Sequence, residues 1–153
     1  YGARRARAVV LTAVRETYEE TGLMLGSAET TNRNPKDPSW QAFVDRGLLP
    51  DLSGIEVFGR AITPPHRHKR FDTWFFLRHV SEDMMTATSD SRELLNVDWF
   101  TFDQIGELKM HRATLMMLQV LKHFLAYDTP PPSVFFSRMM RGTYLQDNFP
   151  TGS

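Results

Sequence analysis

The chain contains no cysteine, so disulfide bonds, zinc–thiolate sites and thiol nucleophiles are excluded. It also has no excess of charge of either sign, because 18 Lys and Arg residues balance 18 Asp and Glu residues. A balanced charge gives no general reason to expect nucleic-acid polymers or anionic membranes as partners. No apolar run approaches the roughly 20 residues that a membrane-spanning helix needs, and residues 1–7 lack the apolar core of a signal peptide. We therefore expect a soluble, cytoplasmic protein that binds neither partner.

The length of 153 residues fits one domain with one core, and no internal repeat divides it. Apolar residues at helical spacing predict two long helices, over 5–21 and 110–127. The apolar stripe predicted to pack the second helix on a sheet consists of Met116, Met117, Val120, Leu121, Phe124 and Leu125. Strands are predicted over 23–25, 55–62, 71–80 and 95–102, and a long loop with a short helix at 40–46 over 26–50. The tail 130–153 shows no clear period, and it could wrap the core or contact a partner. The fold class expected from this pattern is mixed α and β.

Three carboxylates near the end of the first helix carry the clearest chemical signal. Within the stretch R-E-T-Y-E-E-T-G-L, residues 15–23, Glu16, Glu19 and Glu20 stand at i, i+3 and i+4 and therefore share a helix face. Like charges at this spacing, close to a helix C-terminus, are unfavourable unless a cation compensates for them. Mg²⁺ prefers such oxygen ligands, with Glu16 and Glu20 as the best direct candidates, and Arg15 can pair with Glu19. The alternative is an ordinary solvated helix face, since adjacent glutamates are common.

This stretch resembles the second half of the Nudix box, R-E-U-x-E-E-x-G-U, and every fixed residue of that half matches. The upstream half does not match, because Tyr1 stands where the family has glycine and Arg7 where it has glutamate. Nudix domains also place strands before the box, so those N-terminal strands are expected to be missing from the chain as given. A second resemblance covers R-A-I-T-P-P at 60–65 and R-F-D-T-W-F-F at 70–76. It points to the Nudix branch that contains acyl-coenzyme A diphosphatases.

The resemblance implies an α/β (α+β) protein with a Nudix-type α/β/α sandwich and a mixed sheet, spanning 1–153 as a single domain. It implies a metal-dependent hydrolase that cleaves a diphosphate linkage in a nucleoside diphosphate derivative, with a coenzyme A-like substrate as one option. Glu16, Glu19 and Glu20 would hold Mg²⁺ or Mn²⁺, and Arg15 would position a carboxylate. The general base would be a box glutamate or a distant residue, for which Glu93 is the candidate. Nudix proteins are often homodimers, so a homodimer is a further expectation.

The basic stretch 66–70 has two interpretations. Arg67 and Arg70 could bind phosphate oxygens of the substrate, because guanidinium groups offer forked donors, or the stretch could be a solvated loop. His66 and His68 form a His-x-His pair, but two imidazoles without a third ligand are weak grounds for a metal site. Asp72 could orient Arg70 or line a cleft, although a structural role is favoured. The aromatic residues 74–76 are expected to be core residues.

Two other functions fit the sequence. The departures at Tyr1 and Arg7 would suit a Nudix-fold binding or regulatory module without turnover, although the intact Glu16, Glu19 and Glu20 argue against it. A scaffold or dimerisation protein would instead use the Met-rich, aromatic tail as its functional surface. Which diphosphate is cleaved is not encoded in the shared helix, because substrate choice lies in loops and side pockets.

Overall fold

The computed structural model describes residues 2–28, 37–82, 97–110, 112–126 and 133–150. These residues form two compact units, the first comprising Tyr1–Ile55 with Arg78–Trp99 and the second comprising Glu56–Leu77 with Phe100–Ser153. Each unit has its own cluster of buried apolar side chains, where the sequence predicted one core. The assignment of 1–153 to a single domain stays a prediction.

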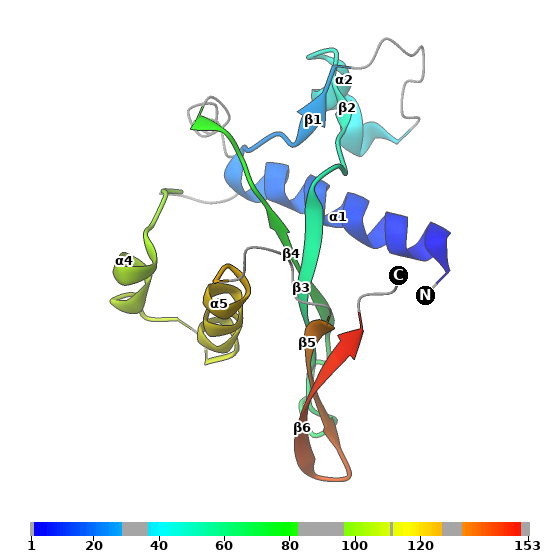
Figure 1. Cartoon of the computed structure of the whole chain (residues 1–153). Coiled ribbons are helices and arrows are strands. Elements are labelled where there is room, and N and C mark those ends of the chain that lie inside the picture. Colours follow the sequence, from blue (N-terminus) through cyan, green and yellow to red (C-terminus); the bar gives the residue numbers. More distant parts are fainter. Residues whose placement is uncertain (1, 29–36, 83–96, 111, 127–132, 151–153) are drawn as a thin grey trace. The chain divides into compact units, whose positions relative to one another are not determined.

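The first unit is organised by helix α1, Ala3–Thr21, which confirms the predicted first helix (Figure 1). The helix ends at Gly22, which adopts a left-handed conformation with φ 77° and donates its N–H to the Tyr18 carbonyl. Glycine suits this position because it has no Cβ to clash there. Val14, on the inner face of α1, is 1% exposed and packs in the core of this unit.

The strand predicted over 23–25 is wrong. Leu23 and Leu25 are buried in the first core, and the Leu25 carbonyl accepts a hydrogen bond from the Asp51 N–H at 3.0 Å, but residues 23–25 form no strand, and the short strand β1, Gly26–Ser27, begins only after them. It pairs antiparallel with β2, Leu49–Pro50. The apolar residues 23–25 were interpreted as a strand. Their burial explains why they are apolar, but a strand also requires backbone pairing with a neighbouring strand.

A short helical segment lies between these strands, close to the predicted helix at 40–46. It consists of the 3₁₀ helix η1, Pro38–Trp40, followed by α2, Gln41–Val44. The carboxylate of Asp37 accepts a hydrogen bond from the Ser39 N–H at 3.0 Å and so caps the first turn. Phe43 is fully buried, at 0% exposure, and belongs to the core that α1 covers.

The second unit contains a four-stranded mixed sheet with the order β4-β3-β5-β6. Strand β3, Ile55–Ile62, has the predicted bounds, and β4, Asp72–Arg78, lies within the predicted 71–80. Strand β5, Ser133–Met140, is parallel to β3, with Arg60 opposite Phe136, and β6, Thr143–Pro150, is antiparallel to β5. The chain is therefore a mixed α and β protein with a mixed sheet, as predicted.

The tail, whose sequence shows no clear period, contains two strands within 133–150. Its two strands, β5 and β6, are joined by the two-residue turn Arg141-Gly142, and both residues have positive φ angles, 49° and 82°. Positive φ at both positions gives the turn a twist that matches paired strands. Arg141 is an uncommon residue for such a turn, which is why the sequence signal was weak.

The predicted strand at 95–102 is also wrong in its described part. Residues 97–101 form no strand, and α4, Phe102–Gly106, begins where the strand was expected to end. Thr101 accepts a hydrogen bond from the Gln104 N–H, while the Gln104 side chain accepts one from the Thr101 N–H. This reciprocal cap stabilises a helix start and overrides the strand tendency of the aromatic residues. Residues 95 and 96 lie outside the described residues.

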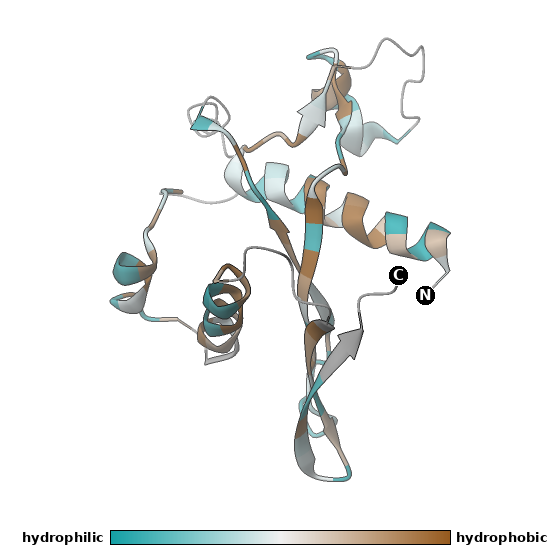
Figure 2. Cartoon of the chain, in the orientation of Figure 1, coloured by the Kyte–Doolittle hydropathy of each residue, from teal (hydrophilic) through white to brown (hydrophobic). Residues whose placement is uncertain are grey.

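Helix α5, Arg112–Phe124, packs on the sheet as predicted, although it is shorter than 110–127. Brown and teal segments both occur along it in Figure 2, as expected of an amphipathic helix. Met117 and Phe124 are buried against Phe58 of β3, and Gly59 leaves the space that the Met117 methyl group fills. Leu125, the last residue of the predicted stripe, is 39% exposed and does not contribute. No helix in the described part of the chain has the length and apolar content needed to span a bilayer.

Replacing Asp51 with Asn is expected to lower the stability of the first unit at neutral pH. The Asp51 carboxylate accepts a hydrogen bond from the Ser53 N–H at 2.9 Å and one from Arg78 at 3.1 Å. Hydrogen bonds from Ser53, and then the charge of Arg78, hold its pKa below the ordinary aspartate value. Its contribution, about 0.5–1 kcal/mol for a partly screened charged hydrogen bond, is therefore complete above pH ~4 and lost as the pH falls through the depressed pKa.

Urea unfolding of both proteins at pH 7 and at pH 2 measures this contribution. We expect Asp51→Asn to be the less stable protein at pH 7, and its deficit to shrink as the pH falls through the depressed pKa of Asp51. An equal deficit at both pH values would contradict the assignment.

Candidate functional site

The acidic end of α1 contains one arginine that holds two of the three predicted carboxylates. Nη1 of Arg15 donates to both carboxylate oxygens of Glu19 at 2.7 Å, and Nη2 donates to Oε1 of Glu16. The Arg15 side chain is 30% exposed, Glu19 30% and Glu16 47%. The hydrogen bond to Glu19 raises the pKa of Arg15. Arg15 therefore holds both carboxylates through hydrogen bonds in a half-buried environment. The prediction had Arg15 pair with Glu19 alone.

Glu20 lies outside this arginine network and is exposed. Within the part of the chain that the structure describes, no group of three or more His, Asp or Glu side chains is arranged to hold a metal ion. The glutamates are therefore on one helix end, as predicted, but two of them face Arg15 and the third faces solvent. Joint metal binding by Glu16, Glu19 and Glu20 stays a prediction.

A fourth carboxylate, Asp37, acts on the same arginine and was missed by sequence reasoning. Its charge helps to raise the pKa of Arg15, and hydrogen bonds from Ser39 hold the pKa of Asp37 itself below the ordinary value. The last turn of α1 has no basic residue of its own, so Arg15 is the cation that compensates for these acids and for the helix dipole. Nothing in the sequence around Asp37 indicated proximity to Arg15.

The acidic helix end is anchored by an aromatic contact on its opposite side. Tyr18 lies between the glutamates in sequence, and its ring meets the buried ring of Phe43 edge-on, with 5.5 Å between centroids. Phe43 in turn meets Trp40 edge-on at 5.3 Å. Such pairs add about 0.5–1.5 kcal/mol beyond their buried area. The rotation of α1, and hence the direction of its carboxylates, is set by this cluster.

The remaining predicted site residues belong elsewhere. Glu93 lies outside the described residues. Arg67 and Arg70 belong to the second unit, in the exposed connection between β3 and β4. The Arg67 N–H donates to the Pro64 carbonyl at 3.1 Å, and Nε of Arg70 donates to the Thr63 carbonyl at 3.4 Å. Their guanidinium groups are solvent-accessible, and phosphate binding by them stays a prediction.

Asp72 does not orient Arg70; it pairs with Arg60. Two hydrogen bonds, at 2.7 and 2.6 Å, join the Arg60 guanidinium to the Asp72 carboxylate. The same guanidinium lies 4.6 Å from the ring centre of Trp74 and 5.1 Å from that of Phe136. The contacts tie three neighbouring strands of the sheet together, so the structural role favoured for Asp72 fits the geometry. Phe75 packs in the second core, as expected of an aromatic residue on a strand.

Comparison of the chain with models of known families, with curated proteins and with solved structures finds no match. The assignment of a function therefore rests on the residues of the acidic helix end and their geometry.

Replacing Arg15 with Lys is expected to lower metal-dependent turnover about 10-fold or more, as loss of a residue that orients metal ligands does. Lysine keeps the charge, but its ammonium cannot hold both Glu16 and Glu19 through a planar fork. The measurement is the initial rate as a function of Mg²⁺ concentration, where we expect weaker apparent metal affinity. Arg46→Lys, which changes an exposed arginine bonded only to the Ala42 carbonyl among the described residues, is the control. Equal rates for wild type and Arg15→Lys would show that the fork has no positioning role.

Proposed function

We propose that the protein is a Mg²⁺- or Mn²⁺-dependent hydrolase of the Nudix type that cleaves a diphosphate linkage in a nucleoside diphosphate derivative. The observation that carries the proposal is the R-E-x-x-E-E-x-G stretch at 15–22, which ends a helix at a left-handed glycine and places Arg15 between two of its glutamates. An ordinary solvent-exposed helix face does not require an arginine whose guanidinium group holds two glutamates of an acidic cluster. The Nudix-type α/β/α sandwich is part of this proposal.

The residues at the helix end suit a hard divalent cation in their donor chemistry. Mg²⁺ typically takes one or two protein carboxylates and keeps waters and substrate phosphate oxygens as its other ligands. Glu20, which is exposed, and Glu16, one turn away with only one oxygen bonded to Arg15, would be these two carboxylates. When bound, the ion would neutralise charge on the diphosphate and favour attack by water on phosphorus.

The protein residues would then divide three tasks. Glu16 and Glu20 would bind the ion, Glu19 would be held by both of its oxygens on Arg15, and Arg15 would keep the carboxylate of Glu16 turned toward the ligand position. Glu19 is also a metal-ligand candidate once the ion displaces part of its bond to Arg15. The general base is a box glutamate or Glu93.

The proposal is tested by assaying the chain against coenzyme A, ADP-ribose, nucleotide sugars and dinucleoside polyphosphates, with Mg²⁺, with Mn²⁺ and with EDTA. Metal-dependent release of a mononucleotide from one class, abolished by EDTA, is the expected result. The absence of both turnover and metal-dependent binding for every member of the panel would overturn the proposal.

A second function is favoured by the residues upstream of the half of the box that the chain matches. Arg7 stands where the Nudix box has a glutamate, and it is exposed on α1. A metal-dependent binding module without turnover would fit this departure. Saturable nucleotide binding that requires Mg²⁺, in the absence of product over hours, would favour the binding module over the hydrolase.

A further inference from the structure

The second unit concentrates positive charge in two short segments, although the whole chain has a formal net charge of zero. Residues 63–71, T-P-P-H-R-H-K-R-F, contain Arg67, Lys69 and Arg70 together with two histidines and no acid. Residues 139–146, M-M-R-G-T-Y-L-Q, contain Arg141 and again no acid. All residues from 65 to 70, and Arg141, are exposed. The charge is therefore strongly asymmetric despite its balance overall.

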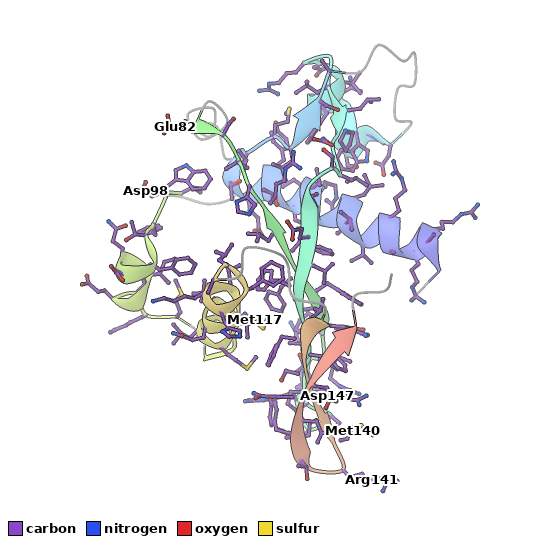
Figure 3. The ribbon with its side chains drawn as sticks, viewed as in Figure 1. Glu82, Asp98, Met117, Met140, Arg141 and Asp147 are labelled. Atoms are coloured by element: carbon purple, nitrogen blue, oxygen red, sulfur yellow. The ribbon has the colours of Figure 1, made fainter. Side chains whose placement is uncertain are left out.

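The sheet topology brings these two segments to one end. Strands β3 and β5 are parallel, with Gly59 opposite Phe135 and Ala61 opposite Ser137, so their C-terminal ends lie at the same edge of the sheet. The connection 63–71 leaves the end of β3, and the turn Arg141-Gly142 leaves the end of β5. We call this end, formed by 65–71 and 140–144, the basic tip. Arg141 and Met140 are at the end of the β5–β6 hairpin in Figure 3.

The basic tip also carries exposed apolar side chains. Phe71 is 62% exposed and Tyr144 56%, the two highest values among the exposed large hydrophobic residues of the described chain, and Met140 is 46% exposed. The connection is closed at its base by hydrogen bonds that the Thr63 N–H donates to the Phe71 carbonyl and the Phe71 N–H donates to Thr63 Oγ1. Phe71 is thus held at the tip by its backbone while its ring stays in solvent. The neighbouring acids are already paired, Asp72 with Arg60 and Asp147 with Arg138.

We propose that the basic tip binds an anionic membrane surface, with Phe71, Met140 and Tyr144 entering the interfacial layer and the surrounding cations facing lipid headgroups. Anionic bilayers bind proteins that place positive side chains next to exposed apolar side chains, because lipid headgroups attract the charges and the interface buries the apolar groups. Each Lys or Arg near such a surface strengthens binding roughly fivefold, and the attraction weakens as salt is added. The inference does not rest on the proposed hydrolase function.

Charge alone would equally suit a nucleic acid, but the apolar residues favour the membrane. Single-stranded nucleic acids stack their bases on planar rings along a groove or sheet face. Here the apolar side chains stand at the ends of two adjacent connections, and one of them, Met140, has no ring. A projecting apolar tip can enter a bilayer interface, whereas it offers no continuous stacking platform.

The test is co-sedimentation of the full chain with vesicles of phosphatidylcholine alone and with vesicles that also contain phosphatidylserine, at low and high salt. The double variant Lys69→Glu, Arg141→Glu reverses one charge in each segment and leaves Arg67 and Arg70 in place. Lys109→Glu, Lys122→Glu makes the same charge change at exposed positions away from the basic tip and is the matched control. Phe71→Ser, Tyr144→Ser removes two exposed rings, and circular dichroism checks that each variant is folded.

We expect binding only to the phosphatidylserine vesicles, weakened by salt, and weakened on the order of 25-fold or more by charge reversal at the tip. The serine variant should bind about tenfold more weakly, since burying an aromatic ring contributes on this scale. Absence of binding by the wild type to the anionic vesicles, or equal loss in the Lys109/Lys122 control, would overturn the proposal. Tighter, tip-dependent binding to a single-stranded oligonucleotide than to the vesicles would replace the membrane with a nucleic acid.

Discussion

Replacing Glu20 with Gln is expected to lower metal-dependent diphosphate hydrolysis by a factor of about 100 or more. Glutamine keeps the size and shape of the side chain but removes the negative charge that makes it a ligand for Mg²⁺. Loss of several kcal/mol of charge stabilisation in the transition state corresponds to at least two orders of magnitude in rate. Glu20 is the sharpest choice because it is exposed and free of the Arg15 network, so its replacement leaves the bonds of Glu16 and Glu19 intact.

The measurement is the initial rate on the best substrate of the panel, with Mg²⁺ varied to separate weaker metal binding from slower chemistry. Glu107→Gln, the same chemical change at an exposed position outside the acidic helix end, should leave the rate unchanged. Without metal, Glu20→Gln should be as stable as wild type or more stable by about 0.2–0.5 kcal/mol, because it removes like-charge repulsion with Glu16 one turn away. A rate equal to wild type at all Mg²⁺ concentrations would sink the assignment of Glu20.

Replacing Phe43 with Ala is expected to cost about 3–5 kcal/mol of stability in the first unit, the range for truncating a fully buried phenylalanine. Phe43 is 0% exposed and makes edge-on contacts with both Tyr18 and Trp40, so its removal leaves a cavity and breaks two aromatic pairs. Few natural domains have much more than about 5–15 kcal/mol of total stability, so much of the first unit would unfold.

Urea unfolding followed by tryptophan fluorescence measures this loss, since Trp40 contacts Phe43 directly. Leu115→Ala, at a position that is 39% exposed on α5, is the matched truncation and should cost much less. Phe43→Leu should recover most of the stability, because it refills most of the cavity. A loss for Phe43→Ala no larger than that for Leu115→Ala would contradict the role of Phe43 as a core anchor.

The two experiments together separate chemistry from support. Glu20→Gln should remove turnover from a folded protein, whereas Phe43→Leu should alter the direction of α1 through Tyr18 without touching a carboxylate. Reduced turnover in Phe43→Leu, with an unchanged net charge at the helix end, would show that the aromatic cluster positions the acidic residues.

Helices α1 and α5 could be predicted from sequence because each has apolar residues at helical spacing that pack in a core. Val14 and Tyr18 follow the helical period on α1, and Met117 and Phe124 follow it on α5, so local pattern and tertiary burial agree. Strand β3 has the predicted bounds because it is apolar, β-branched and ended by the Thr63-Pro64-Pro65 sequence. The predicted helix end at residue 21 agrees with the structure, where Gly22 ends α1 in the left-handed conformation that glycine tolerates.

The errors arise where another interaction overrides the local apolar pattern. Leu23 and Leu25 are apolar because they reach a core, and no neighbouring strand pairs with them. The segment near Trp99 and Phe102 has strand-forming residues, but the cap at Thr101 starts a helix there. Strand β5 lies in the sheet because it pairs in parallel with β3, which is far away in sequence. The local residue pattern of β5 contains no information about such a distant partner.

The sequence by itself determined which residues can carry chemistry: three glutamates on one face of a helix, an arginine within reach of them, and a glycine to end the helix. Helical geometry is local, so residue spacing alone places those side chains. The structure added that Arg15 holds Glu16 as well as the predicted Glu19, while Glu20 stays exposed. Only the tertiary structure decided that the charge of Asp37 acts on Arg15 and that Phe43 contacts Tyr18. It also decided that two basic segments far apart in sequence, 65–71 and 140–144, share one end of a sheet. These facts depend on contacts between distant segments, which burial and strand pairing select among many locally acceptable alternatives.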